Sequence, residues 1–285
     1  LMAVWPDVIR DIKEAIENCN IPDVAKWMEK VLQYNVPHGK MQAYFSIIDD
    51  IEDQSLFRRG QLCWYRYDDV GLVAVNDSFM LQSSIFYLIQ KHFKGKDCYV
   101  KLLETTMKAA MGQSLDLLST NFGNRPNLDL FTTNQYNSII EFKTAYYSAE
   151  IKDQEMFREA TTILTEIGCL FQIQDDYLDC YGDFEICGKD NTDIQEGKCT
   201  WFIVEALQRV TSQQRKILEE CYGNLDREKV QRVKQLFSDL NLLDAYFKYE
   251  EETYNLIDVH IKQMSSGLPH NIFFDMLKNF YHRMS

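Results

Sequence analysis

The sequence predicts an all-α protein, a bundle of roughly ten or more helices in a single domain that spans residues 1–285. Pro and Gly together make up 17 of the 285 residues, about 6%, against roughly 12% in average usage. No Pro lies between Pro126 and Pro269, and apolar residues recur at helical spacing along most of the chain. A fold of many short strands needs more turn residues than this, so long helices are favoured.

The predicted helices follow one another in chain order and are separated by turn signals. Pro22 and Asp23 divide the apolar positions between Trp5 and Leu32 into two helices. Residues 34–40 are expected to form a loop, and residues 41–48 form an apolar run that ends in an acidic segment. A loop rich in Asn, Gly and Pro spans 121–129. Further helices are predicted over 77–93, 101–119, 133–147, 154–181, 201–210, 213–221, 227–239 and 242–264, with a last one ending at 283.

The composition excludes several classes of partner. Lys and Arg number 30 against 43 Asp and Glu, which gives a net charge of −13 and argues against nucleic acid or anionic lipid as the main partner. No segment approaches the roughly 18 apolar residues of a membrane span, so stable membrane insertion is not expected. The eight cysteines contain no C-x-x-C pair, which favours reduced, buried thiols over a zinc site. The chain begins at Leu1 rather than Met. A cytoplasmic location is expected, and mitochondrial or peroxisomal delivery is left open because a targeting segment could precede Leu1.

Two acidic segments repeat one pattern. Residues 49–53 and residues 175–179 both read D-D-x-x-D, and each follows an apolar helical run. The first and last Asp are four residues apart and share one helix face. One such segment alone is typical of a solvated acidic face, but two copies at the inner ends of apolar helices require cations. Oxygen ligands without nearby His or Cys suit Mg²⁺ or Mn²⁺. Two such clusters facing each other would hold a diphosphate through bridging metals.

Basic residues follow the acidic segments, as a phosphate site requires. Arg58 and Arg59 come shortly after the first segment, and Lys189 and Lys198 follow the second. Lys143 lies within a predicted helix. Each of these alone could be an ordinary surface charge. Their repeated position after the acidic segments favours direct contact with a phosphate group.

The motif set resembles one enzyme family. DDIEDQSLFRRGQLCWYR, NDSF, GQSLDLL, FKTAYYS, FQIQDDYLDCYGD and GKDNTDIQEGKCTW occur in this order and are similar to those of the isoprenyl diphosphate synthases, in particular the eukaryotic farnesyl diphosphate synthases. These motifs resemble those of an animal member of the family, in particular an insect one. The resemblance implies an isoprenoid synthase bundle around a central cavity, and a homodimer. It also implies a short-chain prenyltransferase that condenses dimethylallyl or geranyl diphosphate with isopentenyl diphosphate to give geranyl or farnesyl diphosphate. Three Mg²⁺ ions are expected, with Mn²⁺ or Co²⁺ as alternatives.

The resemblance also implies a role for each motif residue. The metals and cations would neutralise the leaving diphosphate, the allylic cation would be attacked by isopentenyl diphosphate, and the released diphosphate would take the proton. The implied metal ligands are Asp49, Asp53 and Asp175, supported by Asp50, Asp176 and Asp179. Arg58, Lys143 and Lys189 would contact the allylic diphosphate, with Gln113 and Asp116 nearby, and Lys198 is a further candidate for substrate binding. Lys40, Gln42 and Arg59 would contact isopentenyl diphosphate, and Thr144 and Gln172 would stabilise the carbocation.

Tyr44 and Phe45 stand four to five residues before Asp49. This spacing places them about one helical turn from the acidic cluster. In the resembled family bulky residues here limit the product to ten or fifteen carbons. Ordinary aromatic core contacts are the alternative interpretation.

Two joints depart from the family pattern. Lys40 directly precedes Met41, where the family has a further stretch about as long as a helical hairpin. Ser148 directly precedes Ala149, where the family continues its helix. We expect that segments of the protein are missing from the chain at both joints. Cα atoms much further apart than the roughly 3.8 Å of bonded neighbours would support this expectation.

Two other functions remain open from the sequence. Glu52, Phe57, His38 and Asn191 differ from the usual motif residues, and the chain ends in YHRMS without a basic finish. These changes favour a terpene synthase on the same scaffold, which would convert a prenyl diphosphate without isopentenyl diphosphate. The retained Lys40, Gln42 and Arg59 favour the prenyltransferase. A catalytically inactive partner subunit is a third hypothesis, against which the intact acidic clusters argue.

Overall fold

The computed structural model describes residues 5–17, 21–35, 43–94, 98–120, 125–145, 154–182, 191–265 and 268–281. These residues contain thirteen α-helices and one two-stranded hairpin, so the predicted all-α fold is confirmed. The chain divides into two compact units, Leu1–Leu103 and Glu104–Ser285, which are described separately. Both joints questioned in the sequence, 40/41 and 148/149, lie outside the described residues.

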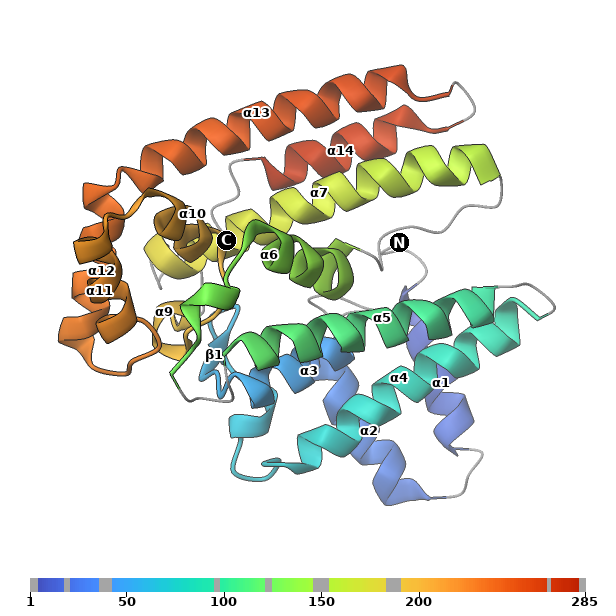
Figure 1. The fold of residues 1–285 in the computed structure, drawn as a ribbon. Helices are drawn as coiled ribbons and strands as arrows, with labels where there is room; N and C mark the ends of the chain where they lie inside the picture. The colour runs from blue at the N-terminus through green and yellow to red at the C-terminus, as the bar shows by residue number, and fades with distance from the viewer. Residues whose placement is uncertain are drawn as a thin grey trace. The chain divides into compact units, whose positions relative to one another are not determined.

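The first unit packs four helices around one apolar core. These are α1 (Trp5–Glu17), α2 (Pro22–Asn35), α3 (Ala43–Glu52) and α4 (Val73–His92). The other three all contact α4, the long helix drawn in teal in Figure 1. Met28, Val31, Leu32 and Ile47 are almost fully buried where the helices meet. The helices follow the predicted apolar spacing, and this packing holds the acidic end of α3 in place.

A short hairpin that the sequence did not predict follows α3. Strands β1 (Phe57–Arg58) and β2 (Gln61–Leu62) pair in antiparallel fashion, and the 3₁₀-helix η2 (Trp64–Arg66) comes after them. The two turn residues, Arg59 and Gly60, have φ angles of +53° and +74°. Two consecutive positive φ angles are typical of the tight turns that match strand twist. Two-residue strands leave almost no alternation to detect in a sequence, so the hairpin gave no signal.

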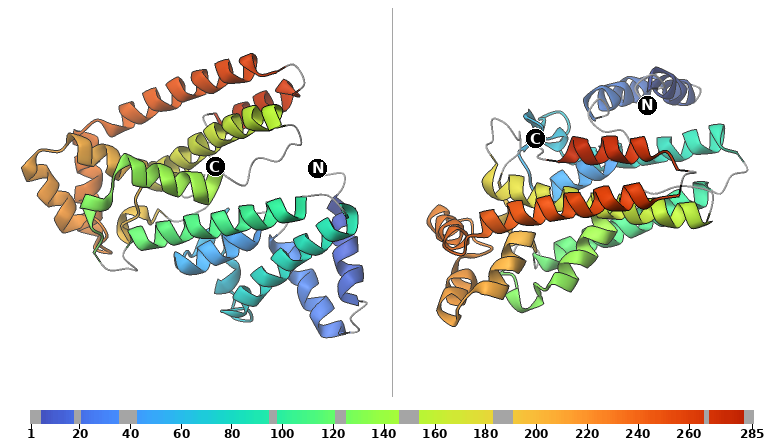
Figure 2. Two further views of the ribbon diagram at one scale, coloured as in Figure 1. Left: turned by 45° about the vertical axis from the view of Figure 1, so that its right-hand side comes forward. Right: turned by 90° about the horizontal axis from the view of Figure 1, so that it is seen from above.

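The second unit is built around the long helix α7 (Gln154–Tyr181), against which α13 (Leu242–Gln263) and α14 (His270–Phe280) pack. Figures 1 and 2 show these three helices side by side. Helix α5 (Cys98–Ser119) begins in the first unit and ends in the second. The remaining elements of the second unit are η4 (Leu128–Leu130), α6 (Thr133–Ile140), η5 (Glu141–Ala145), α9 (Asp193–Glu196), α10 (Trp201–Arg209), α11 (Ser212–Cys221) and α12 (Arg227–Asp239).

Four helix starts in the second unit carry side-chain caps. Thr132, Thr200 and Thr211 each accept a backbone N–H of the first turn through the hydroxyl oxygen, and Asp226 does so through its carboxylate. A capping side chain satisfies one of the unpaired N–H groups at a helix start. The predicted boundaries at 201, 213 and 227 agree with these capped starts within one residue, and the boundary at 242 coincides with the start of α13, which has no side-chain cap.

The predicted continuous helix over 133–147 is wrong in one respect. Its α-helical part ends at Ile140, and Glu141–Ala145 form a π-helical turn, η5. At this turn the chain passes very close to α5, and Gly112 of α5 allows this approach because it has no side chain. A Cβ atom on Gly112 would lie 2.1 Å from the backbone nitrogen of Lys143. Two backbones therefore touch at this point, and π-turns of this kind often occur at functional sites.

Two expectations from composition can be compared with the described residues. Cys63, Cys169, Cys180, Cys199 and Cys221 are all free, and all except Cys169 are buried. Within the described ranges, none of the helices is both long and apolar enough to cross a membrane.

Candidate active site

The first acidic cluster lies at the end of α3 and is tied to the hairpin by Arg58. The guanidinium of Arg58 donates from Nε to Asp50 Oδ1 at 2.6 Å and from Nη2 to Asp49 Oδ2 at 2.9 Å. The Asp50 side chain is only 6% exposed, whereas that of Asp49 is 25% exposed. Burial raises the pKa of Asp50, and the positive charge of Arg58 opposes that rise. Asp53 is half-buried on the same segment.

Arg58 and Arg59 both line a pocket within the first unit, together with Asp50 and the rings of Tyr34 and Trp64. Trp64 is held in place because its indole N–H donates to the fully buried Asp77 at 2.9 Å. The pocket thus joins two cations to aromatic walls. Such a lining suits an anion with an apolar portion.

Tyr44 and Phe45 lie near the start of α3 with their ring centroids 4.1 Å apart. Tyr44 is 6% exposed and Phe45 is half-buried. The carbonyl of Tyr44 accepts a hydrogen bond from Ser78 Oγ on α4 at 2.9 Å. The two rings pack on each other, which is compatible with both interpretations given above.

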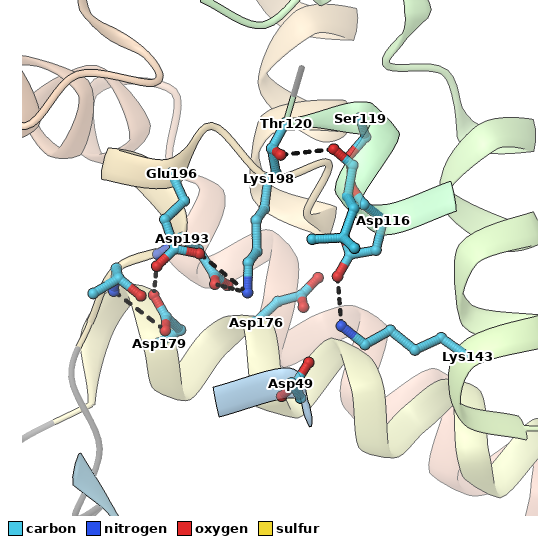
Figure 3. Close-up of polar contacts among 12 residues, drawn as sticks. Asp49, Asp116, Ser119, Thr120, Lys143, Asp176, Asp179, Asp193, Glu196 and Lys198 are labelled. Carbon is cyan, nitrogen blue, oxygen red and sulfur yellow. Dashed lines mark hydrogen bonds and ion pairs between the residues drawn. The ribbon is translucent and has the colours of Figure 1, made fainter. Parts of the chain in front are cut away.

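The second acidic cluster lies near the end of α7, and protein donors hold its buried carboxylates Asp176 and Asp179. Asp179 accepts the backbone N–H of Asp193 at 3.0 Å, at the start of α9. Lys198 lies 3.7 Å from Asp193 and 3.3 Å from Glu196 (Figure 3). Asp179 therefore holds the loop that carries Lys198, and Asp175 is the half-buried member of the cluster.

Asp176 is the most heavily engaged residue of that cluster. Its Oδ2 accepts from Tyr136 Oη at 2.6 Å and from the backbone N–H of Trp201 at 2.8 Å, and its Oδ1 accepts from Gln172 Nε2 at 3.0 Å. Burial, and then the charge of Asp193, raise its pKa to about 7, while these hydrogen bonds act in the opposite direction. The residue links α6, α7 and the start of α10.

The π-turn η5 brings two predicted residues against partners from other helices. Thr144 is buried and its Oγ1 donates to Gln172 Oε1 of α7 at 2.7 Å. Lys143 Nζ lies 2.5 Å from Asp116 Oδ2 of α5 (Figure 3). The sequence motifs that contain Asp116, Lys143 and Gln172 are far apart in the chain, and the structure brings their side chains together in the second unit.

The predicted site residues therefore fall into three sets. The first set is brought together within a unit: Asp49, Asp50 and Arg58 in the first, and Asp116, Lys143, Thr144, Gln172 and Asp176 in the second. The second set lies on the same or adjoining elements: Asp53, Arg59, Gln113 and Asp175, with Asp179 and Lys198 joined to α9. The third set, Lys40, Gln42 and Lys189, lies outside the described residues.

Sequence reasoning missed four structural contacts of the predicted site residues, made by Tyr136, the backbone N–H of Trp201, Gly112 and the Asp193–Glu196 pair that holds Lys198. Asp193 and Glu196 belong to the motif GKDNTDIQEGKCTW, and two acidic residues so close to Lys198 in the sequence indicate an ion pair. Tyr136 gave no such signal, because one Tyr in an amphipathic helix looks like any core residue. Among the described residues, no group of three or more His, Cys, Asp or Glu could hold a metal ion by itself.

Comparisons with known proteins show the family to which the chain belongs. The family model described as "Polyprenyl synthetase" matches residues 17–240. The farnesyl pyrophosphate synthase of Murgantia histrionica is 40% identical over 99% of this chain and 81% of its own length. That of Gallus gallus is 37% identical over 98% of this chain and 90% of its own. A T. brucei farnesyl diphosphate synthase complexed with the bisphosphonate BPH-721 shares the fold, with a TM-score of 0.88 at 24% identity over 100% of this chain and 98% of that one.

The fold and the two aspartate-rich helix ends define an all-α prenyltransferase. The chain belongs to the polyprenyl synthetase family, as its motifs predicted.

Proposed function

We propose that the protein is a metal-dependent short-chain prenyltransferase that condenses dimethylallyl or geranyl diphosphate with isopentenyl diphosphate to give geranyl or farnesyl diphosphate. The names of the relatives support this substrate class. The observation that carries it is the contact of Thr144 with Gln172 next to Lys143 and Asp116. It gathers the neutral oxygens of Thr144 and Gln172 beside the Lys143 ammonium, which Asp116 holds in place; such oxygens and a cation are what stabilisation of an allylic cation and a departing diphosphate requires.

The metal is proposed from the chemistry of the donors. Asp49, Asp53 and Asp175 offer carboxylate oxygens, the ligands that Mg²⁺ prefers, and Mg²⁺ commonly completes its shell with water and substrate phosphates. Asp50, Asp176 and Asp179 are buried and support these ligands. When bound, the metal ions would neutralise the diphosphate that leaves. Three Mg²⁺ ions are proposed, with Mn²⁺ or Co²⁺ as alternatives.

The chain's own residues have separate tasks in this reaction. The diphosphate is held by the positive charges of Arg58, Lys143, Lys189 and Lys198. The guanidinium of Arg58 then binds the diphosphate in addition to Asp49 and Asp50. Thr144 and Gln172 face the cation through oxygen atoms. The buried apolar surroundings exclude water, which would quench that cation. The released diphosphate accepts the proton that is lost after the condensation, so no His or Cys is needed as a base.

One experiment tests the function and its main alternative. Purified protein is incubated with Mg²⁺ and dimethylallyl or geranyl diphosphate, with and without isopentenyl diphosphate, and the products are analysed by chromatography. We expect geranyl or farnesyl diphosphate only when isopentenyl diphosphate is present. A hydrocarbon or alcohol formed without it would instead show a terpene synthase, which the comparisons do not support. Complete inactivity would favour the inactive-subunit hypothesis.

The assembly we propose is a homodimer in which a face of α5 is covered by a second copy. Met107, Met111 and Leu118 are 67%, 49% and 58% exposed and recur at helical spacing, so they lie on one side of the helix. Light scattering during size-exclusion chromatography tests this. The wild type should elute at twice the chain mass, and Met107→Glu with Met111→Glu should elute as a monomer, whereas equal masses for both would contradict the dimer.

The single domain and its two abrupt joints also remain proposals. The alignment with the Murgantia relative extends over 334 positions, whereas this chain has 285 residues. The relative therefore carries stretches without a counterpart here, which supports the view that segments are missing at 40/41 and 148/149. Sequencing of the transcript across both joints tests this. We also propose a cytoplasmic location, which imaging of the full-length tagged protein would check.

A further inference from the structure

The hydrogen bonds around Asp176 run in one direction only. The backbone N–H of Trp201 can donate but not accept, and it points to Asp176 Oδ2 at 2.8 Å. Tyr136 donates its hydroxyl to the same oxygen at 2.6 Å. In the structure Gln172 directs Nε2 to Asp176 Oδ1 at 3.0 Å. An amide NH₂ can donate but not accept, so this third contact of Asp176 has the same direction as the other two.

This orientation of Gln172 determines what Thr144 does. Because the NH₂ group faces Asp176, the carbonyl oxygen Oε1 faces Thr144 Oγ1 at 2.7 Å. A carbonyl oxygen cannot donate, so the Thr144 hydroxyl must give its proton to Gln172. The Thr144 oxygen therefore presents its lone pairs, and not its proton, to any other neighbouring group. Lone pairs stabilise a developing positive charge, whereas an outward O–H would oppose it.

We propose that Asp176 is a positioning residue that acts through Gln172 to keep the Thr144 oxygen, rather than its proton, directed at the reacting allylic carbon. This inference rests on the proposed function, since it assumes an allylic cation. It assigns Asp176 a task different from that of metal ligand. Asp176 is 5% exposed and both of its oxygens already accept protein donors, which supports the distinction. Asp175, next to it, is only half-buried.

Asp176→Asn tests the direction of the chain. The oxygen of the introduced amide can keep the donors of Tyr136 and Trp201, so its NH₂ group then faces Gln172. Gln172 must turn its oxygen to that NH₂ group and its own NH₂ to Thr144, and the Thr144 proton is displaced outward. We expect kcat to fall about tenfold to hundredfold, the effect of one misdirected buried hydrogen bond, with the Mg²⁺ concentration for half-maximal rate unchanged. A rise of that concentration about tenfold or more would show a metal ligand and overturn the proposal.

The matched control is Tyr136→Phe. It removes one donor from Asp176 and leaves the direction of the Gln172 and Thr144 bonds unchanged, so kcat should stay within about threefold of wild type. A loss equal to that of Asp176→Asn would show that the burial of Asp176, and not the direction of its bonds, matters. If Asp176→Asn does not fold, the spectroscopic measurement on the wild type described below still tests the proposal.

A double-mutant cycle decides whether Asp176 acts through Thr144. In a Thr144→Val background the hydroxyl is absent, so Asp176→Asn should cost no more than about twofold in kcat. The same cost in both backgrounds would overturn the proposal. Wild type assayed with and without isopentenyl diphosphate tests the proposed function separately, because both candidate reactions ionise an allylic diphosphate and the cycle applies to either.

A spectroscopic readout is independent of activity. Nuclear Overhauser effects between the side-chain amide protons of Gln172 and the methyl group of Thr144 report which end of Gln172 faces Thr144. We expect this contact to be weak or absent in wild type and strong in Asp176→Asn. A strong contact in wild type would mean that Gln172 already points its NH₂ group at Thr144, and the proposal would be wrong.

Discussion

Gly112 lies directly against the backbone of Lys143. A Cβ on Gly112 would be 2.1 Å from Lys143 N and 2.5 Å from Lys143 Cα, distances at which no side chain fits. The contact joins α5 to the π-turn η5. It places Asp116, one turn further along α5, within reach of the Lys143 ammonium. A residue without a side chain is thus what allows the Lys143 and Thr144 segment to approach α5.

Gly112→Ala is therefore expected to destabilise the fold and to displace Lys143. Overpacking of this kind costs about 1–3 kcal/mol, and the cost is at the upper end where the obstacle is backbone. Urea denaturation measures the loss, and the rate of product formation should fall with it. Ser114→Ala on the exposed side of the same helix is the control and should change stability by less than about 0.5 kcal/mol. Unchanged stability of Gly112→Ala would contradict the close contact.

Asp49→Ala and Asp175→Ala should each nearly abolish turnover. Asp49 is more exposed than Asp50, and Asp175 is more exposed than Asp176 and Asp179. Loss of a charge-stabilising group at a transition state costs at least about a hundredfold in rate. A chelator should have the same effect on wild type, with recovery when Mg²⁺ is restored. A radiochemical assay of product measures both. Asp68→Ala and Asp239→Ala alter exposed aspartates and should retain wild-type rates; full activity of either cluster variant would remove the metal-site assignment.

The stability of the first unit should depend on Asp11 in a pH-dependent manner. Its carboxylate accepts from His92 Nε2 at 2.5 Å and lies 3.2 Å from Lys91 Nζ, and the hydrogen bond with His92 lowers its pKa from 3.8. A lowered pKa means that the ionised group stabilises the folded state above pH 3.8 and that this contribution is lost as the pH falls through the folded value.

Asp11→Asn should therefore reduce the melting temperature more at about pH 7 than at about pH 3, where wild type has itself begun to lose the interaction. Glu29→Gln is the control, because Glu29 pairs with Lys13 at the surface, with side chains 44% and 37% exposed. Exposed pairs contribute little, so this variant should change the melting temperature only slightly at either pH. An equal reduction for Asp11→Asn at both pH values would show that packing, and not charge, is responsible.

Phe45→Ala should lengthen the product if the aromatic pair limits chain growth. Phe45 is half-buried and packs on Tyr44 with ring centroids 4.1 Å apart, so its removal opens space beside α3. The expected result is a shift towards products with at least one further five-carbon unit, detected by chromatography of the dephosphorylated alcohols. Phe45→Tyr keeps the ring and should keep the product. An unchanged product distribution in Phe45→Ala would leave the two rings as ordinary core.

Much of the fold could be read from local patterns. Apolar residues at helical spacing marked α7 and α13, and Pro22 marked the start of α2, because helix formation depends on neighbours three and four residues away. The two D-D-x-x-D segments were visible for the same reason. The hairpin at Arg59 and the π-turn at Lys143 were not visible, since the first depends on two backbone angles and the second on a helix much earlier in the chain.

The sequence by itself determined that the chain forms helices, that carboxylates occupy one face at the ends of two of them, and that the chain belongs among the prenyltransferases. Only the tertiary structure decided which carboxylates turn towards protein donors. Asp176 meets Tyr136 from 40 residues away and the N–H of Trp201 from 25 residues away, and Arg58 reaches back to Asp49 and Asp50. The physical reason is that residue spacing fixes the side of a helix on which a group lies, whereas its charge state and hydrogen bonds depend on the segment that packs against that side.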